Sequence, residues 1–124
     1  MDDRPIDLRN LLQLVESQKP LDAQFLLDHG CLLSPGDPRP LVKGINYLLN
    51  YLARYGSGTI HVALSNRREH YHLSLMVACG SDAVDPLAAN LGEAFEDFGG
   101  TVEELSEPGR FLQVVVTFAK VAAG

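Results

Sequence analysis

The sequence has few of the features that mark a membrane protein or a metalloprotein. It contains no tryptophan and only two cysteines, Cys31 and Cys79, whose spacing does not fit a metal site. Its longest apolar runs are a few residues, whereas a membrane-spanning helix needs roughly 20. No positively charged segment followed by an apolar run opens the chain. We therefore expect no membrane segment, no bound metal, and a cytoplasmic location with reduced thiols.

Basic residues are also scarce. The chain has 10 Lys and Arg against 16 Asp and Glu, which gives a formal net charge of −6 at pH 7. The basic residues form no run, although nucleic acids and anionic membrane surfaces attract proteins through basic stripes. We therefore expect neither of these partners.

The length of 124 residues suits one domain with its own core, because domains cluster near roughly 100–150 residues. The sequence shows no internal repeat and no low-complexity segment that would divide it. We expect residues 1–124 to form a single domain.

The first third of the chain predicts a helix, a short apolar segment and a loop. Apolar residues recur at helical spacing from Ile6 to Val15, and Lys19 and the proline after it end this helix. Residues 23–33 are apolar but short, which is compatible with a short strand. Residues 34–40 contain three prolines and predict a loop.

A central helix follows this loop. Asp37 is the expected N-cap and Pro38 the expected first helical residue. Apolar residues continue at helical spacing from Arg39, and Gly56 and Gly58 close the helix. The apolar residues are Leu41, Ile45, Leu48, Leu49 and Leu52.

Two alternating runs, residues 59–65 and 70–77, surround a polar turn and predict a hairpin with one buried face. His61, His70 and His72 fall on its other face, and His61 and His72 are expected to be diagonal neighbours there. A metal site needs three or four ligands with supporting contacts, and no fourth candidate is present. We expect an ordinary polar sheet face.

The last third predicts a helix and a second hairpin. Residues 85–98 carry apolar side chains at helical spacing. Val102 lies on the first arm of the final hairpin, and Leu112 to Phe118 alternate on the second. The order of elements predicts an α+β fold, a two-layer α/β sandwich with a mixed, mostly antiparallel sheet and helices on one face.

Three stretches resemble motifs of the sensor histidine-kinase ATP-binding domain, which has the GHKL or Bergerat fold. PIDLRNLLQLV is similar to an opening helix with the pattern V-D-L-x-x-L-L. GDPRPLVKGINYLLNYLARYG resembles G-D-P-x-x-L-x-x-V-L-x-N-L-L-x-N-A-x-K-Y-T, and FGGTVEELSEPGRFLQVVVTF resembles H-G-G-x-I-x-V-x-S-x-P-G-x-G-T-x-F-x-V. The order and spacing of the three matches favour this fold over most of the chain.

The resemblance places Tyr47 and Tyr51 where the family has the two asparagines that hold magnesium and phosphates. Magnesium prefers hard oxygen ligands, and a phenol that stays protonated near pH 7 is a poor substitute. Tyr55 continues the row, and Arg54 matches a phosphate-facing lysine of the family. The tyrosines either pack at the edge of the core or line a smaller, altered pocket.

The other nucleotide-binding motifs are also incomplete. The adenine-recognising box D-x-G-x-G falls near VACGSD, where Cys79 takes the acidic position and only Gly80 matches. The resemblance implies a mobile lid and a second glycine-rich box, but only six residues join the strand to the next predicted helix. Asp85 is an anion near the start of that predicted helix, where an anionic ligand would need hydrogen-bond donors. Gly92 is the one glycine that we assign as a remnant of the nucleotide-binding elements.

These departures predict a degenerate domain without nucleotide, magnesium or any other cofactor, which acts by protein contact in bacterial two-component-type signalling without phosphotransfer. In an alternative register Asn46 and Asn50 take the asparagine positions, although helix geometry directs both toward solvent. The chain would then be an active, ATP- and Mg²⁺-dependent protein kinase similar to anti-sigma-factor kinases. A third reading is a small-molecule binder that uses the remnant pocket of Tyr47, Tyr51 and their neighbours.

Apolar residues on the expected solvent face indicate a protein contact. Met76, Phe111 and Val115 fall on the unburied face of the sheet, and the stretch from His29 to Leu33 is also expected to be exposed. A sheet face that keeps apolar residues commonly pairs with another protein. We expect this face to bind a signalling partner or a second copy of the chain.

Overall fold

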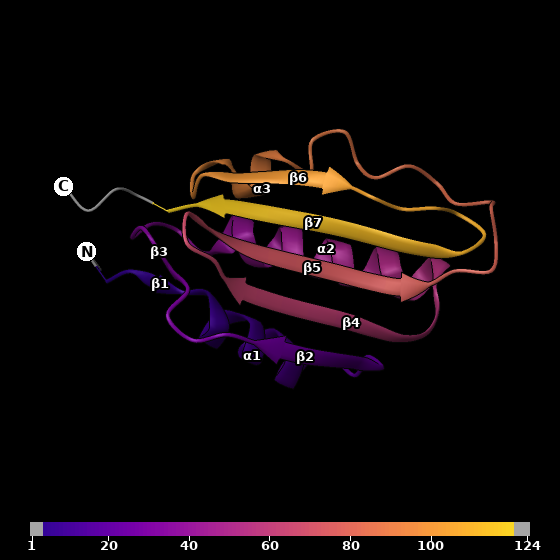
Figure 1. Ribbon diagram of the computed structural model, residues 1–124, viewed down its shortest axis with the longest axis horizontal. Coiled ribbons are helices and arrows are strands. Elements are labelled where there is room, and N and C mark those ends of the chain that lie inside the picture. Colours follow the sequence, from indigo (N-terminus) through magenta and orange to yellow (C-terminus); the bar gives the residue numbers. More distant parts are fainter. Residues whose placement is uncertain (1–3, 121–124) are drawn as a thin grey trace.

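The computed structural model describes residues 4–120. In chain order the elements are β1 (Ile6–Asp7), α1 (Leu8–Gln18), β2 (Ala23–Leu27), β3 (Leu32–Leu33), α2 (Arg39–Tyr55), β4 (Ser57–Asn66), β5 (His70–Ala78), α3 (Glu93–Glu96), β6 (Gly100–Glu104) and β7 (Phe111–Ala119). Five strands form one sheet in the order β2-β4-β5-β7-β6, and β1 pairs with β3 beside it (Figure 1). The pairing of β2 with β4 is parallel, and the other pairings of the sheet are antiparallel.

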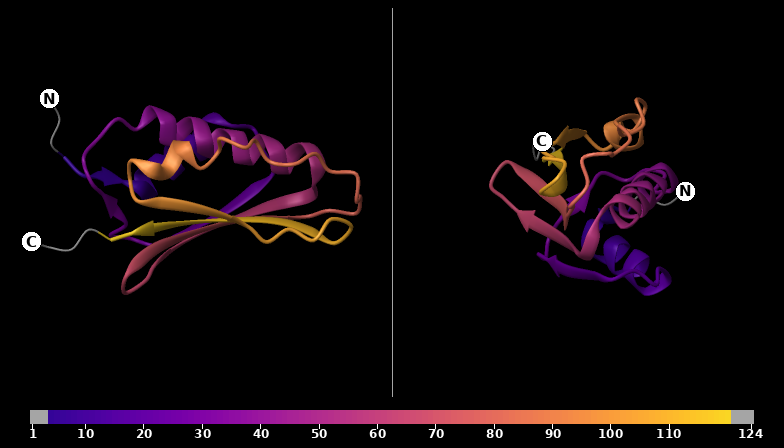
Figure 2. Two further views of the ribbon diagram at one scale, coloured as in Figure 1. Left: turned by 90° about the horizontal axis from the view of Figure 1, so that it is seen from above. Right: turned by 90° about the vertical axis from the view of Figure 1, so that its right-hand side faces the viewer.

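The helices lie on one face of the sheet, and no helix of residues 4–120 covers the opposite face (Figure 2). This arrangement confirms the predicted α+β sandwich with a mixed, mostly antiparallel sheet. None of the helices in the described chain has the length and apolar character that crossing a bilayer requires.

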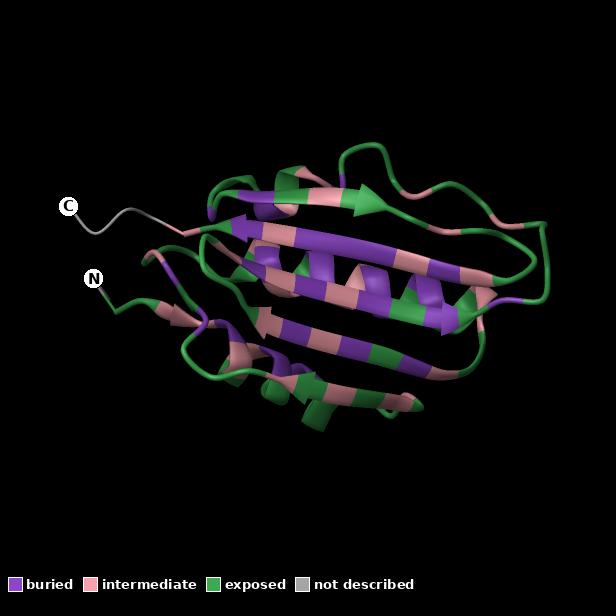
Figure 3. Cartoon of the chain, in the orientation of Figure 1, coloured by how far each residue is buried: buried purple, intermediate pink, exposed green. Residues whose placement is uncertain are grey.

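The core lies between α2 and the three central strands. Side chains on a strand alternate between the two faces, so that every second residue of β4, β5 and β7 points toward the helices and is buried (Figure 3). The predicted apolar stripe of α2 meets them. The residues of this interface include Leu41, Ile45, Leu48, Leu52, Val62, Leu64, Leu73, Leu75, Leu112, Val114, Val116 and Phe118.

Both long helices begin one or more residues later than the sequence indicated. Ile6 and Asp7 pair with Leu33 and Leu32 as β1, and the Asp7 side chain then caps α1 by accepting from the Asn10 N–H at 3.2 Å. The N-cap of α2 is Pro38 rather than Asp37. The Asp37 carboxylate nevertheless accepts from the Arg39 N–H at 3.0 Å, so it still satisfies one free amide at the helix start.

The prediction of a helix over residues 85–98 is wrong. Only Glu93–Glu96 is helical, and the preceding residues run irregularly past α2. Pro86 disfavours helical backbone at Asp85, and Gly92 weakens any helix that contains it. Leu87 packs against the core from the irregular segment. The apolar spacing in residues 85–98 therefore indicated which side chains are buried, but it did not indicate a helix.

One expectation about the sheet face opposite the helices is also wrong. His61 lies opposite Met76 and His72 lies opposite Ser65, so the two histidines are not diagonal neighbours. The rings of His70 and His72 lie side by side, with centroids 6.4 Å apart. Within residues 4–120 no group of three or more His, Cys, Asp or Glu side chains is arranged to hold a metal ion.

The stretch from His29 to Leu33 is only partly exposed. Cys31 and Leu33 are buried. The pairing of β3 with β1 directs every second side chain of this stretch toward the core. Val115 is buried as well, although its register with Ser74 places it on the sheet face that the helices do not cover.

The contact between α2 and α3 predicts the effect of a glycine substitution. A Cβ at Gly44 would lie 2.8 Å from the Ala94 Cβ and 2.9 Å from the Phe95 ring. Gly44→Val should therefore lower the free energy of unfolding by about 2 kcal/mol through overpacking, as measured by denaturant unfolding. Gly92→Val is the matched control, because a Cβ at Gly92 meets nothing within 4 Å. Equal losses for the two variants would contradict a close α2–α3 contact.

Candidate functional site

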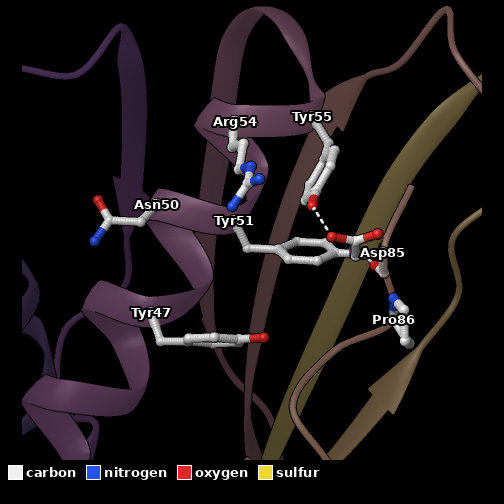
Figure 4. A pocket seen from close by; sticks show the side chains of 7 residues that line it. All are labelled: Tyr47, Asn50, Tyr51, Arg54, Tyr55, Asp85 and Pro86. Carbon is white, nitrogen blue, oxygen red and sulfur yellow. Dashed lines mark hydrogen bonds between the residues drawn. The ribbon is translucent and has the colours of Figure 1, made fainter. Parts of the chain in front are cut away.

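Three tyrosines form a row on one side of α2. Tyr47, Tyr51 and Tyr55 are spaced four residues apart, which places them on one helix face. Figure 4 shows their rings projecting toward Asp85 and Pro86, which belong to the segment of residues 81–92 that we call the strap. The ring centroids of Tyr47 and Tyr51 are 6.3 Å apart, and those of Tyr51 and Tyr55 are 5.1 Å apart.

Each phenolic oxygen of this row makes a hydrogen bond to the strap. The Tyr51 hydroxyl donates to the main-chain oxygen of Asp85 at 2.6 Å, and the Tyr55 hydroxyl donates to the Asp85 carboxylate at 2.7 Å. The Tyr47 oxygen accepts from the Ala88 N–H at 2.8 Å. The strap has no regular secondary structure before its last turn, so the bonds of Tyr51 and Tyr47 satisfy backbone groups that a helix would otherwise satisfy.

Burial keeps the middle tyrosine neutral. Tyr51 is 7% exposed, and this burial, together with the nearby charge of Glu104, raises its pKa to about 12. The hydrogen bond to Asp85 raises the pKa of Tyr55. Both phenols therefore remain hydrogen-bond donors near neutral pH.

A pocket of about 270 Å³ lies beside the tyrosine row. Its lining consists of Tyr47, Asn50, Tyr51, Arg54, Tyr55, Asp85 and Pro86. The exposed guanidinium of Arg54 is 5.2 Å from the Tyr55 ring centroid. A second hollow of about 280 Å³ shares Tyr47 as a wall and extends past Lys43 to Leu91. The predicted pocket residues of α2 are thus together, while Gly80 is exposed and does not line this pocket.

The two asparagines lie on a different side of α2 from the tyrosine hydroxyls. The Asn50 side chain is exposed, points away from the tyrosines and accepts from Lys19 Nζ at 2.8 Å (Figure 4). Asn46 is half-buried rather than directed to solvent, and its Oδ1 is buried without a hydrogen-bond partner in the described chain. Helix periodicity therefore assigned Asn50 correctly to solvent, whereas Asn46 on the same helix face is partly covered.

Cys79 is buried at the end of β5. Its Sγ lies 3.3 Å from the main-chain oxygen of Tyr55 and 3.1 Å from that of Ser81, so the thiol can donate to either. The thiol therefore contacts both the C-terminal end of α2 and the start of the strap.

The pocket offers one cation and one carboxylate. Arg54 is the only cation among the described residues that line it, and one basic residue is a weak anchor for a triphosphate. Asp85 places a carboxylate there, and its charge opposes phosphate groups. The oxygens on the facing side of α2 are neutral phenols, which are weak magnesium ligands. Flat rings and hydrogen-bonding groups suit the binding of a small neutral molecule or of protein better.

The sequence did not reveal the role of Asp85. Its partners Tyr51 and Tyr55 are more than 25 residues away in the chain, and no local spacing connects them. The one available signal was the presence of three tyrosines at helical spacing, since buried phenols need hydrogen-bond partners.

The Tyr51 hydrogen bond predicts a measurable loss of stability. Tyr51→Phe removes the donor and leaves the Asp85 carbonyl without a partner, so the free energy of unfolding should fall by about 1–2 kcal/mol. Tyr71→Phe is the control, because Tyr71 is equally buried and its described contact, with Lys120 Nζ at 5.0 Å, involves the ring. The control should change stability by less than about 0.5 kcal/mol in the same denaturant experiment. Similar losses in both variants would contradict a special role of the Tyr51 hydroxyl.

The raised pKa of Tyr51 predicts a loss of stability in alkaline solution. The folded-state pKa of about 12 exceeds the ordinary value of 10.0, so the Tyr51 contribution is complete below about pH 10 and is lost as the pH rises toward about 12. Phenolate absorbance should show a tyrosine that ionises near pH 12 and is missing in Tyr51→Phe. A wild-type protein in which every tyrosine ionises near pH 10 would contradict this prediction.

Comparisons with known proteins place this geometry in a known fold. No protein-family model and no curated protein sequence matches the chain. Among solved structures, the histidine-kinase domain of the E. coli osmosensor EnvZ aligns with a TM-score of 0.73 and 14% identity, over 100% of this chain and 94% of that one. The ATP-binding domain of PrrB from Mycobacterium tuberculosis aligns with a TM-score of 0.71 and 17% identity, over 98% and 100%.

The Acinetobacter baumannii histidine kinase AdeS also aligns, with a TM-score of 0.71 and 15% identity. The alignment covers 93% of this chain but 66% of the AdeS chain, so the similarity is confined to part of that protein. At these identities the likeness concerns the fold. The chain has the GHKL fold of histidine-kinase ATP-binding domains.

Proposed function

We propose that this chain is a degenerate histidine-kinase-like domain that does not bind magnesium ATP and acts by protein contact in bacterial signal transduction, in the cytoplasm. The observation that carries the proposal is the attachment of α2 to the strap by Tyr47, Tyr51 and Tyr55. The signalling role follows from the likeness to histidine-kinase domains, and the cytoplasmic location agrees with two free cysteines.

The tyrosine row leaves little room for phosphates on this side of α2. The resemblance puts the magnesium- and phosphate-binding asparagines of the family at Tyr47 and Tyr51, and the Tyr51 ring is buried there. Phosphates at the positions of the Tyr47 and Tyr51 rings would have to displace these rings from the strap, which costs their hydrogen bonds and their burial. In the pocket beside the row they would gain the exposed Arg54 as a basic partner.

The charge distribution favours the same conclusion. Residues 81–107, which include the strap, α3 and β6, contain no Lys or Arg. Their acidic residues are Asp82, Asp85, Glu93, Glu96, Asp97, Glu103, Glu104 and Glu107. A triphosphate beside this segment would meet repulsion rather than charge-assisted hydrogen bonds.

A second candidate function is the binding of a small molecule in the pocket beside the tyrosine row. Its volume of about 270 Å³ and its mixture of aromatic rings with Arg54 and Asp85 favour a compact ligand with polar groups. Such a ligand would bind without magnesium and without displacing the strap.

A calorimetric titration tests the main proposal. ATP and ADP, each with and without Mg²⁺, should give no binding heat with the wild-type protein up to millimolar nucleotide, and Asn50→Ala should behave identically. The ATP-binding domain of PrrB, titrated under the same conditions, is the positive control.

Magnesium-dependent binding in the micromolar range that Asn50→Ala abolishes would overturn the proposal and support an active kinase. Nucleotide binding that is independent of both magnesium and Asn50 would overturn it in favour of the small-molecule pocket.

A further inference from the structure

The face of the sheet opposite the helices is twisted, and no element of the described chain covers it (Figure 2). We call it the open face. Strand register defines a row across all five strands, which consists of Leu26, Ala63, Ser74, Val115 and Glu103. The adjacent rows point to the helices, as the burial of Val62, Leu75 and Val114 shows.

Small side chains occupy the centre of the open face. Ala63 on β4 and Ser74 on β5 lie opposite one another, and Val115 on β7 is only 5% exposed. Small residues keep the backbone close to the surface, so a second sheet can approach to the distance of about 10 Å at which sheets stack.

The open face is nearly free of formal charge. Glu103 on the edge strand β6 is the only charged residue in the central row. The next row on the same face consists of Gln24, His61, Met76 and Gln113 and has no formal charge when His61 is neutral. By comparison, 21% of all residues in the chain are charged. Solvated sheet faces are usually polar and charged, so this composition indicates a covered surface.

Large apolar side chains nevertheless extend from this neutral face. Leu26 is 77% exposed at one side and Met76 is 37% exposed near the centre. In these two rows they are the large apolar side chains that remain exposed, because Val115 is only 5% exposed.

The charge of the chain favours a second copy as the occupant. Two copies carry a net charge of −6 each and repel one another wherever their acidic surfaces meet, above all along residues 81–107. The open face is a surface on which two such chains can approach with little repulsion. A strongly basic or acidic partner would gain no complementary charges there.

The area of the open face is sufficient for a weak dimer. The strands of the sheet contain between five and ten residues, and at about 3.3 Å per residue and about 4.8 Å between strands they cover roughly 600 Å². Two copies would bury roughly 1,200 Å² in total, which is the lower end of the range for specific interfaces.

We propose that the open face is the contact surface for a second copy of this chain, packed sheet against sheet. The contact is isologous, so Leu26 and Met76 of each copy enter the same interface. The inference rests on the proposed function for the role of this contact, but its existence does not depend on whether nucleotide binds.

Sedimentation of the full chain from micromolar to millimolar concentration tests the proposal. The wild-type mass should rise from 13.5 kDa to twice that value. Met76→Lys and, independently, Ala63→Lys should raise the dissociation constant of the dimer at least about tenfold, because each buries an unpaired ammonium group. Leu14→Lys is the matched control, since Leu14 is 54% exposed on α1, away from the open face.

The control should dimerise like the wild type, and circular dichroism should show that all variants are folded. A wild-type protein that stays monomeric at millimolar concentration would overturn the proposal. A dimer that neither open-face variant weakens would also overturn it, because another surface would then form the contact. These outcomes are independent of the nucleotide titration, so the failure of one proposal can be told from the failure of the other.

Discussion

The attachment of α2 to the strap by phenolic oxygens is the interaction on which the rest of the candidate site depends. The strap has almost no secondary structure, and its backbone groups obtain partners from Tyr47 and Tyr51. The rings occupy the side of α2 that faces a nucleotide in the histidine kinases that the sequence resembles. The same three side chains therefore hold an irregular segment against α2.

The position of this row follows from how α2 packs on the sheet. One apolar stripe of the helix is buried against β4 and β5, and the tyrosines lie at the border of that stripe, half in the core and half facing the strap. Gly44 allows α3 to come close to the start of the helix, and Cys79 contacts the end of it. The helix is thus held at both ends, with the acidic strap along one side and the nearly neutral open face on the far side of the sheet.

Local patterns predicted most of the fold but less of the site. Burial decides both the alternation in the central strands and the apolar stripe of α2, and sequence periodicity is a direct sign of burial. The topology was inferred from the family resemblance. Periodicity failed where distant partners decide the conformation. Leu87 and Leu91 suggested a helix, although the strap is held by tyrosines. Asn46 is half-buried rather than solvated, and the Cys31 carbonyl accepts from the Leu8 N–H beside an unforeseen strand pair. The tyrosines were identified from spacing, but their hydrogen bonds to the strap were not.

Amide hydrogen exchange of the strap tests the central claim most directly. The Ala88 N–H, which donates to the Tyr47 oxygen, should exchange much more slowly than in an unfolded peptide, and its rate should be the same with and without magnesium ATP. An unprotected Ala88 amide would contradict the attachment of the strap. An exchange rate that changes on addition of magnesium ATP would contradict the claim that the strap and the tyrosine row exclude the nucleotide.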